Sequence, residues 1–294
     1  MIKPLIMDCT LRDGSYAINF KFNQKDTSVI TKKLSRAKIP LIEVGHGIGL
    51  GASKKGLGNS ACSDEEYCIA ASESIEGESK WGMFCIPGIS SIEDLKMASS
   101  NGIDFIRIGT DVLNIKSSRK YIEFAKSEGI QVFSNFMKSD KADPKTFAKY
   151  AKESLNYGSD VIYIVDSCGG MFPNDLKKYI SETFDKNPSI ELGFHGHDNL
   201  GVGMANCLLS LQEGVRYIDS TLQGLGRSSG NVCTEHLICV LEKKGILKEV
   251  DPIEIMNIGE KYIRPLISST GISSLDITLG WTLTHSSHMP MILS

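Results

Sequence analysis

The stretch IELGFHGHDNL, residues 190–200, ends an apolar run with two histidines, His195 and His197, that stand two positions apart. Side chains alternate between the two faces of a β-strand, so both imidazoles would point the same way if this run is a strand. Such a pair suits a divalent metal, although an isolated H-x-H motif is weak evidence and also fits two structural histidines. The surrounding chain decides between these interpretations.

The stretch belongs to a pattern in which short apolar segments and longer amphipathic segments alternate along the chain. The apolar segments predict strands at residues 4–8, 41–45, 81–86, 103–109, 131–136, 161–166, 190–195 and 216–222. The amphipathic segments predict helices at residues 24–37, 64–76, 91–100, 117–128, 144–157, 174–186, 201–213 and 232–244. Strands that alternate with helices pair in parallel, and eight such units close most readily into a (β/α)8 TIM barrel.

A doubly wound open sheet is the structural alternative. It predicts a G-x-G-x-x-G fingerprint directly after the first strand, but that strand leads into DCTLRDG at 8–14, and the glycine-rich segment 45–51 does not fit the fingerprint. The sequence therefore favours the barrel, as a catalytic domain over residues 1–248. Residues 249–294 predict a short helical C-terminal extension packed on the barrel, because this segment is too small to hold a core of its own.

Composition narrows the class of protein. The chain has 294 residues, 41% of them hydrophobic, and a formal net charge of -3, which gives no electrostatic reason to expect nucleic acid or an anionic membrane as a partner. We expect a cytoplasmic enzyme, because the sequence contains neither an apolar run long enough to span a bilayer nor a secretory signal. The eight cysteines include no C-x-x-C pair, so we expect reduced thiols rather than disulfides or a zinc cluster.

The functional residues of a TIM barrel lie at the carboxyl ends of its strands. Polar residues at those places are Arg12, Asp13, Glu43, His46, Asp166, Ser167, His195, His197, Asp198 and Asn231. Two imidazoles and a carboxylate that converge from opposite strands would form a mixed nitrogen and oxygen site for a divalent ion, open to substrate or water.

Five segments share an order and composition with a known family: DCTLRDG at 8–14, IEVGHG at 42–47, DSCGG at 166–170, HGHDN at 195–199 and GLGRSSGN at 224–231. Together they resemble the metal-dependent pyruvate aldolase and lyase superfamily, whose members are TIM barrels similar to HMG-CoA lyase. The resemblance extends over about residues 5–288. EVGHGIGLG, DSCGGMFPNDL and the late TLGWTLTHSS are most similar to the 4-hydroxy-2-oxovalerate aldolase branch.

The resemblance implies a divalent-metal-dependent aldolase that cleaves or forms a C–C bond of a 4-hydroxy-2-oxo acid through a pyruvate enolate. It implies that Mn²⁺ or Mg²⁺ is bound by Asp13, His195 and His197, with Asn231 as a candidate further ligand. Arg12 would hold the enolate oxygen or the carboxylate of the 2-oxo acid. The negative charge of an enolate needs a cation and fixed donors nearby, and these residues supply both.

Three further residues are expected to support this site. Glu43 matches the glutamate of the family's Asp-Arg-Glu signature, and we expect it to orient Arg12 through a charge-assisted hydrogen bond. Asp166 is a candidate orienting residue and Ser167 a candidate contact to the substrate carboxylate. The glycines at 224–230 would either present backbone N–H groups to an anion or form a tight turn.

The residue that takes the C4 hydroxyl proton departs from the family pattern. The aldolases usually have a histidine two positions after R-D-G, where this chain has Tyr16, and a C-terminal tyrosine where this chain has His285. One hypothesis is that Tyr16 and His285 form the acid–base pair with their positions exchanged, His285 being the base. The alternative is a diverged site in which His285 is a surface residue. His46, in the glycine-rich loop 45–58, is a second candidate base or substrate ligand, and this loop is either an active-site lid or an ordinary flexible loop.

Two other functions remain open: an acyl-CoA lyase or Claisen-type synthase of the same superfamily, and a catalytically diverged metal-binding scaffold, which Tyr16 favours. The expected small-molecule partners are a 2-oxo acid and an aldehyde, and a homodimer is compatible with the sequence. Aldolases of this branch bind an acylating aldehyde dehydrogenase through a helical C-terminal region. We expect no such complex, because the extension at 249–294 is shorter than that region.

Overall fold

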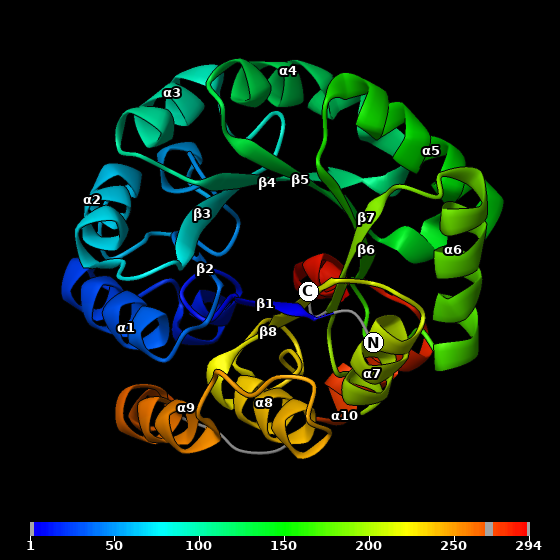
Figure 1. Cartoon of the computed structure of the whole chain (residues 1–294). Coiled ribbons are helices and arrows are strands. Elements are labelled where there is room, and N and C mark those ends of the chain that lie inside the picture. The colour runs from blue at the N-terminus through cyan, green and yellow to red at the C-terminus, as the bar shows by residue number, and fades with distance from the viewer. Residues whose placement is uncertain (1–2, 268–272, 293–294) are drawn as a thin grey trace.

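Eight parallel strands form a closed barrel surrounded by helices (Figure 1), in a computed structural model that describes residues 3–267 and 273–292. The strands are β1 (Leu5–Asp8), β2 (Leu41–Glu43), β3 (Lys80–Cys85), β4 (Phe105–Asp111), β5 (Gln131–Met137), β6 (Val161–Asp166), β7 (Glu191–Gly196) and β8 (Tyr217–Ser220). The last strand closes on the first, with Leu5 opposite Tyr217 and Asp8 opposite Ser220. The predicted TIM barrel is therefore confirmed.

One helix follows each strand and covers the outside of the barrel. The helices are α1 (Gln24–Arg36), α2 (Asp64–Ser74), α3 (Ile92–Ser100), α4 (Arg119–Ser127), α5 (Pro144–Tyr157), α6 (Pro173–Lys186), α7 (Gly203–Gln212) and α8 (Thr234–Lys243). Asn23, Ser63 and Ser91 begin the first three of them with reciprocal capping boxes, which satisfy otherwise free backbone N–H groups. Local signals thus fix where these helices start.

The inward-facing side chains change in character along the strands. Near the amino ends they form an apolar cluster that includes Leu41, Phe105, Phe133 and Tyr217. Two residues further along the same strands stand Glu43, Arg107, Asn135 and Asp219, all buried. Because residues two apart share a face, the barrel interior changes from aromatic to charged toward the carboxyl ends. The site therefore sits on a packed aromatic floor.

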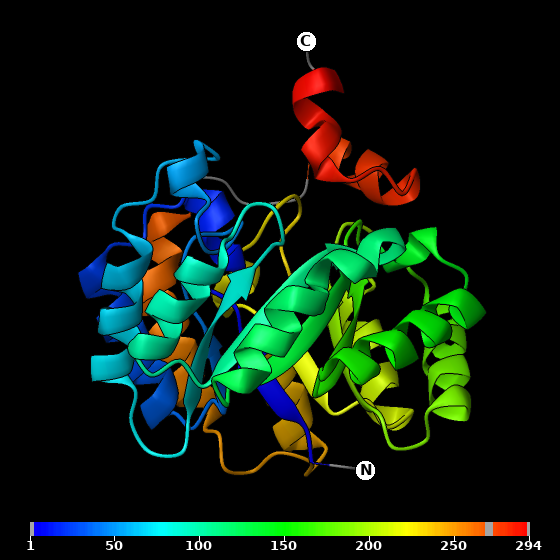
Figure 2. The ribbon, with the colours of Figure 1, turned by 90° about the horizontal axis from the view of Figure 1, so that it is seen from above.

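The C-terminal residues lie in two places. Helix α9 (Pro252–Ile258) packs beside the barrel against α1 and α8. Helices α10 (Ser274–Trp281) and α11 (Met289–Ile292) lie over the mouth, at the end opposite the N-terminus (Figure 2). Asn199, after β7, donates from Nδ2 to the Asp276 carbonyl oxygen at 2.9 Å and so ties α10 to the mouth. The segment over the mouth is thus held to the loop after β7.

Two other features concern the class of protein. All eight cysteines are unpaired, as expected for reduced thiols. Among residues 3–267 and 273–292, every helix is too short or too polar to cross a lipid bilayer.

The aromatic floor should carry much of the barrel's stability. Phe133 is fully buried and stacks on Phe105 with ring centroids 5.1 Å apart. We expect Phe133→Ala to lower the free energy of unfolding by about 3–5 kcal/mol, because it removes buried contacts and leaves a cavity. Urea unfolding followed by circular dichroism measures this loss. The matched control is Phe172→Ala, whose ring is 53% exposed and whose loss should change stability by less than about 0.5 kcal/mol. Equal losses in both variants would contradict the assignment.

Candidate active site

A pocket opens at the carboxyl ends of the strands, where the interior becomes charged. Its lining consists of Arg12, Asp13, Tyr16, Gly47, Ile48, Phe84, Ile86, Asn135, Met137, Val165, Ser167, His195, His197 and Arg227. The polar members lie on β5 and β7, in the segments that directly follow β1, β6 and β7, and in the loop after β8, although these segments are far apart in the sequence. Closure of the barrel therefore brings together most of the residues predicted to form the site.

Asp13, His195 and His197 form a group in the pocket that fits a metal ion. One ligand atom from each lies within 4.8 Å of the other two, and all three side chains are buried. His195 Nδ1 is 2.8 Å from Asp219 Oδ2, and His197 Nδ1 is 3.2 Å from the Gly230 carbonyl oxygen. These contacts fix Nδ1 as the donor in each ring, so Nε2 is the nitrogen with a lone pair for a metal; Nε2 of His197 also lies 3.4 Å from Arg227 Nη2.

The protonation states of these side chains suit metal binding. Burial lowers the pKa of His197 to about 3, so the imidazole is neutral at neutral pH. Burial disfavours the Asp13 carboxylate, but the neighbouring Arg12 guanidinium and the two histidines hold the pKa of Asp13 well below its usual range. A carboxylate and two neutral imidazoles are donors for divalent transition ions and for Mg²⁺.

Asn231 lies next to Asp13, and its side-chain oxygen is available as a ligand. Its Nδ2 donates to Asp13 Oδ2 at 2.6 Å and to the Leu225 carbonyl oxygen at 3.1 Å. Its Oδ1 is buried without a hydrogen-bond partner, which fits a further ligand. Gly226 permits this approach, because a Cβ there would lie 2.2 Å from Asn231 Nδ2.

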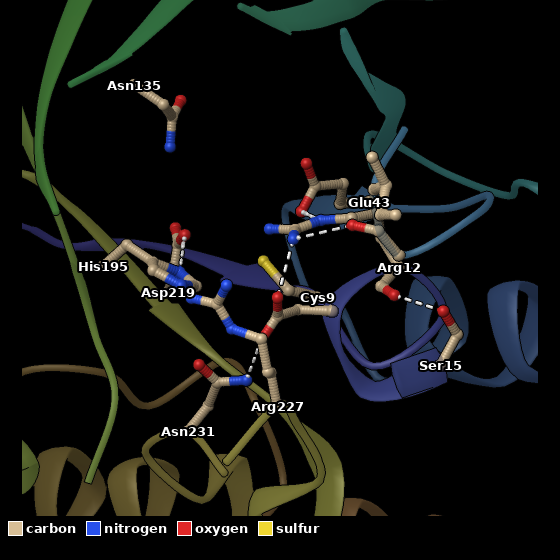
Figure 3. Close-up of polar contacts among 12 residues, drawn as sticks. Cys9, Arg12, Ser15, Glu43, Asn135, His195, Asp219, Arg227 and Asn231 are labelled. Carbon is tan, nitrogen blue, oxygen red and sulfur yellow. Dashed lines mark hydrogen bonds and ion pairs between the residues drawn. The ribbon is translucent and has the colours of Figure 1, made fainter. Parts of the chain in front are cut away.

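Arg12 is held on both sides by carboxylates. Its Nε donates to Glu43 Oε2 at 2.8 Å (Figure 3), and its Nη1 donates to Asp13 Oδ1 at 2.7 Å. The predicted pairing of Glu43 with Arg12 is therefore present. Glu43 is fully buried and does not line the pocket, which places it behind Arg12 rather than against a ligand.

Sequence reasoning missed Arg107 and Asp219. Arg107 is fully buried, and donates from Nη1 to Glu43 Oε2 at 2.9 Å and from Nη2 to Asp219 Oδ2 at 2.5 Å. The same Asp219 oxygen contacts His195, so Arg107 connects the arginine and the metal-binding halves of the site. The missed signal was a charged residue in the apolar run FIRIG, two positions after Phe105.

The structure gives His46 a role that differs from the predicted base or substrate ligand. Its ring is buried, stacks on Phe20 and does not line the pocket. His46 Nδ1 accepts from the Ile48 N–H at 3.1 Å, and Nε2 lies 3.2 Å from the Gly58 carbonyl oxygen. Both ring nitrogens hold the loop 45–58 together, so neither is free for a substrate.

The two proposed acid–base residues, Tyr16 and His285, lie in different parts of the site. Tyr16 lines the pocket, and burial raises the pKa of its phenol. His285 belongs to the segment over the mouth and is partly buried, and it is not among the lining residues. Burial, with Arg227 and Lys138 nearby, lowers the pKa of His285 to about 3. At neutral pH the phenol is therefore protonated and the imidazole is a neutral, weak base.

Asp166 and Ser167 differ in their access to the pocket. The Asp166 carboxylate accepts the backbone N–H groups of Gly170 and Met171 at 3.1 and 2.9 Å, and does not line the pocket. It orders the turn after β6, which suits an orienting residue rather than a substrate contact. Ser167 lines the pocket; its Oγ accepts the Lys138 N–H at 2.9 Å, which leaves the hydroxyl proton free to donate.

Comparisons with known proteins agree with this geometry. The model of a family described as HMGL-like matches residues 3–261. A 4-hydroxy-2-oxovalerate aldolase from Carboxydothermus hydrogenoformans is 37% identical over 90% of this chain and 78% of its own length. A 4-hydroxy-2-oxovalerate aldolase 2 from Rhodococcus jostii is 35% identical over 92% of this chain and 78% of its own.

Solved structures extend the likeness to the fold. The N-terminal domain of a putative aldolase from Bacteroides vulgatus matches with a TM-score of 0.80 and 25% identity, over 98% of this chain and 96% of that one. An HMG-CoA lyase from Brucella melitensis matches with a TM-score of 0.74 and 17% identity, over 90% and 98% of the two chains. At that identity the lyase supports the barrel fold alone.

Asp219 should control metal affinity through His195. Asp219→Asn removes the charge that orients the imidazole, so we expect Mn²⁺ to bind about 10- to 100-fold more weakly. Titration of the metal-free protein with Mn²⁺, followed by electron paramagnetic resonance, measures the affinity. The control is Asp175→Asn on α6, whose side chain is 53% exposed and whose change should leave Mn²⁺ affinity unaltered. Unchanged affinity in the Asp219 variant would remove this residue from the site.

Proposed function

Because the chain belongs to the HMGL-like family, we propose that it is a divalent-metal-dependent aldolase that cleaves a 4-hydroxy-2-oxo acid into pyruvate and an aldehyde, or joins them in reverse. The observation that carries the proposal is the convergence of Asp13, His195 and His197 beside Arg12 in one pocket. The names of the 35–37% identical relatives support the same reaction.

The chemistry sets the tasks of the side chains. In cleavage the C4 hydroxyl loses its proton, the C3–C4 bond breaks, and its electron pair passes to the pyruvate enolate, which is then protonated at C3. Mn²⁺ or Mg²⁺, held by Asp13, His195, His197 and Asn231, supplies positive charge for the enolate when bound. Arg12 donates to the 2-oxo or enolate oxygen, and Glu43 keeps its guanidinium in place. Ser167 donates to the carboxylate of the 2-oxo acid.

Tyr16 and His285 are the proposed acid–base pair. His285, as the free base, accepts the C4 hydroxyl proton, and Tyr16 holds or returns a proton at its phenolic oxygen. The raised pKa of Tyr16 and the lowered pKa of His285 give each group the required form at neutral pH. The weak basicity of His285 works against rapid proton uptake, so the two residues are tested separately below.

The rival functions have less support. The similarity to HMG-CoA lyase, at 17% identity, supports only the fold. Relatives named as aldolases are 35–37% identical to the chain. A catalytically diverged scaffold would keep the metal cluster but release no pyruvate. The absence of a dehydrogenase partner remains a prediction from the sequence, which is also compatible with a homodimer.

Activity should depend on the metal. We expect pyruvate release from a panel of 4-hydroxy-2-oxo acids to cease after EDTA treatment and to return when Mn²⁺ or Mg²⁺ is added. Asp13→Asn should reduce kcat/KM by at least about 100-fold, since it removes the charged ligand. A coupled lactate dehydrogenase assay measures pyruvate. The diverged scaffold is favoured if the metal-loaded protein releases none from any member of the panel.

Separate Tyr16→Phe and His285→Ala variants test the acid–base pair. If each group moves a proton, each variant should lower kcat by about 100-fold or more while Mn²⁺ affinity is retained. Since the pKa of His285 is lowered to about 3, its titration should leave kcat unchanged across the neutral pH range and reduce kcat only in strong acid. The matched control is His236→Ala on the outer helix α8. Near wild-type cleavage in both variants would rule out the pair.

A further inference from the structure

The pocket contains one arginine that the mechanism above does not use, Arg227 in the loop after β8. Its Nη2 lies 3.4 Å from His197 Nε2, and its guanidinium carbon lies 5.8 Å from the centre of the Tyr16 ring. Figure 3 shows the side chain extending toward His195. Arg227 therefore borders both the metal cluster and the proposed acid–base residue.

Arg227 is half-buried and differs in its partners from the two buried arginines, Arg12 and Arg107. Arg12 and Arg107 each lie within ion-pair distance of two carboxylates. Within residues 3–267 and 273–292, Arg227 has no carboxylate at that distance, and its Nε is buried without a hydrogen-bond partner. The guanidinium as a whole is partly exposed, but a buried donor without an acceptor is costly, and an anionic ligand would supply that acceptor.

Metal binding strengthens this requirement. The Asp13 carboxylate, which also lines the pocket, interacts electrostatically with Arg227. A divalent ion bound by Asp13 and His197 would neutralise that charge and repel the guanidinium from its side of the pocket. An anion on its other side would then balance the charge of the guanidinium.

The position of Arg227 indicates which half of the substrate carries that anion. In the proposed function, Arg12 and the metal hold the 2-oxo acid head, and Tyr16 lies near C4. Arg227, beside Tyr16, thus faces the aldehyde half. The geometry points to an anionic tail: Arg227 binds a carboxylate or phosphate on the aldehyde half, so the substrate is a 4-hydroxy-2-oxo acid with a second acidic group. This inference rests on the proposed function and names its substrate class.

The first test compares matched aldehydes in the addition of pyruvate: 4-oxobutanoate against pentanal for a carboxylate, and glyceraldehyde 3-phosphate against glyceraldehyde for a phosphate. We expect the wild type to prefer the charged member of one pair by about tenfold or more in kcat/KM, and the pair that discriminates identifies the anion. Arg227→Gln should abolish this preference through KM while retaining kcat, and Arg227→Lys should restore part of it. Arg36→Gln, on the outer surface of α1, is the control.

The second test measures binding without turnover. The Mn²⁺-loaded protein is titrated calorimetrically with 2-oxoheptanedioate and 2-oxoheptanoate, which lack the 4-hydroxyl group and cannot be cleaved. If the tail is a carboxylate, the wild type should bind the diacid about tenfold more tightly, and Arg227→Gln, saturated with Mn²⁺, should bind both ligands equally.

These two tests separate the failure of each proposal. Aldol activity without any preference for charged aldehydes or for the diacid would contradict the proposal of an anionic tail but not the proposed function. An equal loss toward charged and neutral ligands in Arg227→Gln would also contradict the anionic tail. Preferential binding of the diacid without any aldol reaction would overturn the proposed function and leave the role of Arg227 standing.

Discussion

A chain of ion pairs crosses the barrel interior and ends at the metal-binding cluster, through Arg12, Glu43, Arg107, Asp219 and His195. Each carboxylate lies between two positive or hydrogen-bond-donating groups, so no member can be removed without leaving a buried charge. Such a loss costs about 3–5 kcal/mol, whereas a well-packed apolar replacement of a whole buried pair is often neutral or stabilising. This series of ion pairs is therefore explained better by the positions that it imposes on Arg12 and His195 than by its contribution to stability.

The barrel can hold these ion pairs because aromatic side chains pack in the layer below them. Phe105 and Phe133 fill the interior below, and the Tyr163 ring lies 4.5 Å from the Arg107 guanidinium carbon. The rings exclude water from beneath the charges and offer a favourable face to the guanidinium. Exclusion of water strengthens each ion pair and each hydrogen bond to the metal-binding imidazoles, which keeps the site in one arrangement before substrate enters.

The sequence predicted the strands and helices well, because strand and helix periodicity and the capping residues are local signals. It also predicted which residues meet at the mouth, since parallel strands present their carboxyl ends at one edge. Arg107 was missed, because its partner Asp219 lies on β8, and only closure of the barrel brings β4 and β8 together. His46 was misassigned for the opposite reason. It has the right residue type in the right place, but its hydrogen bonds to Ile48 and Gly58 depend on a loop path that no local pattern specifies.

The two ends of the pocket are built from different parts of the chain. The head-group residues Arg12 and His195 are fixed by ion pairs within the barrel, whereas Arg227 lies in a loop that the C-terminal segment holds. Ser228 Oγ donates to Asp276 Oδ1 on α10 at 2.8 Å, and Ser228 adopts a left-handed backbone with φ of 56°. A residue next to Arg227 thus depends on a helix outside the barrel. Changes in that helix or loop can alter tail recognition while the ion-pair chain, and with it the chemistry at the head group, stays the same.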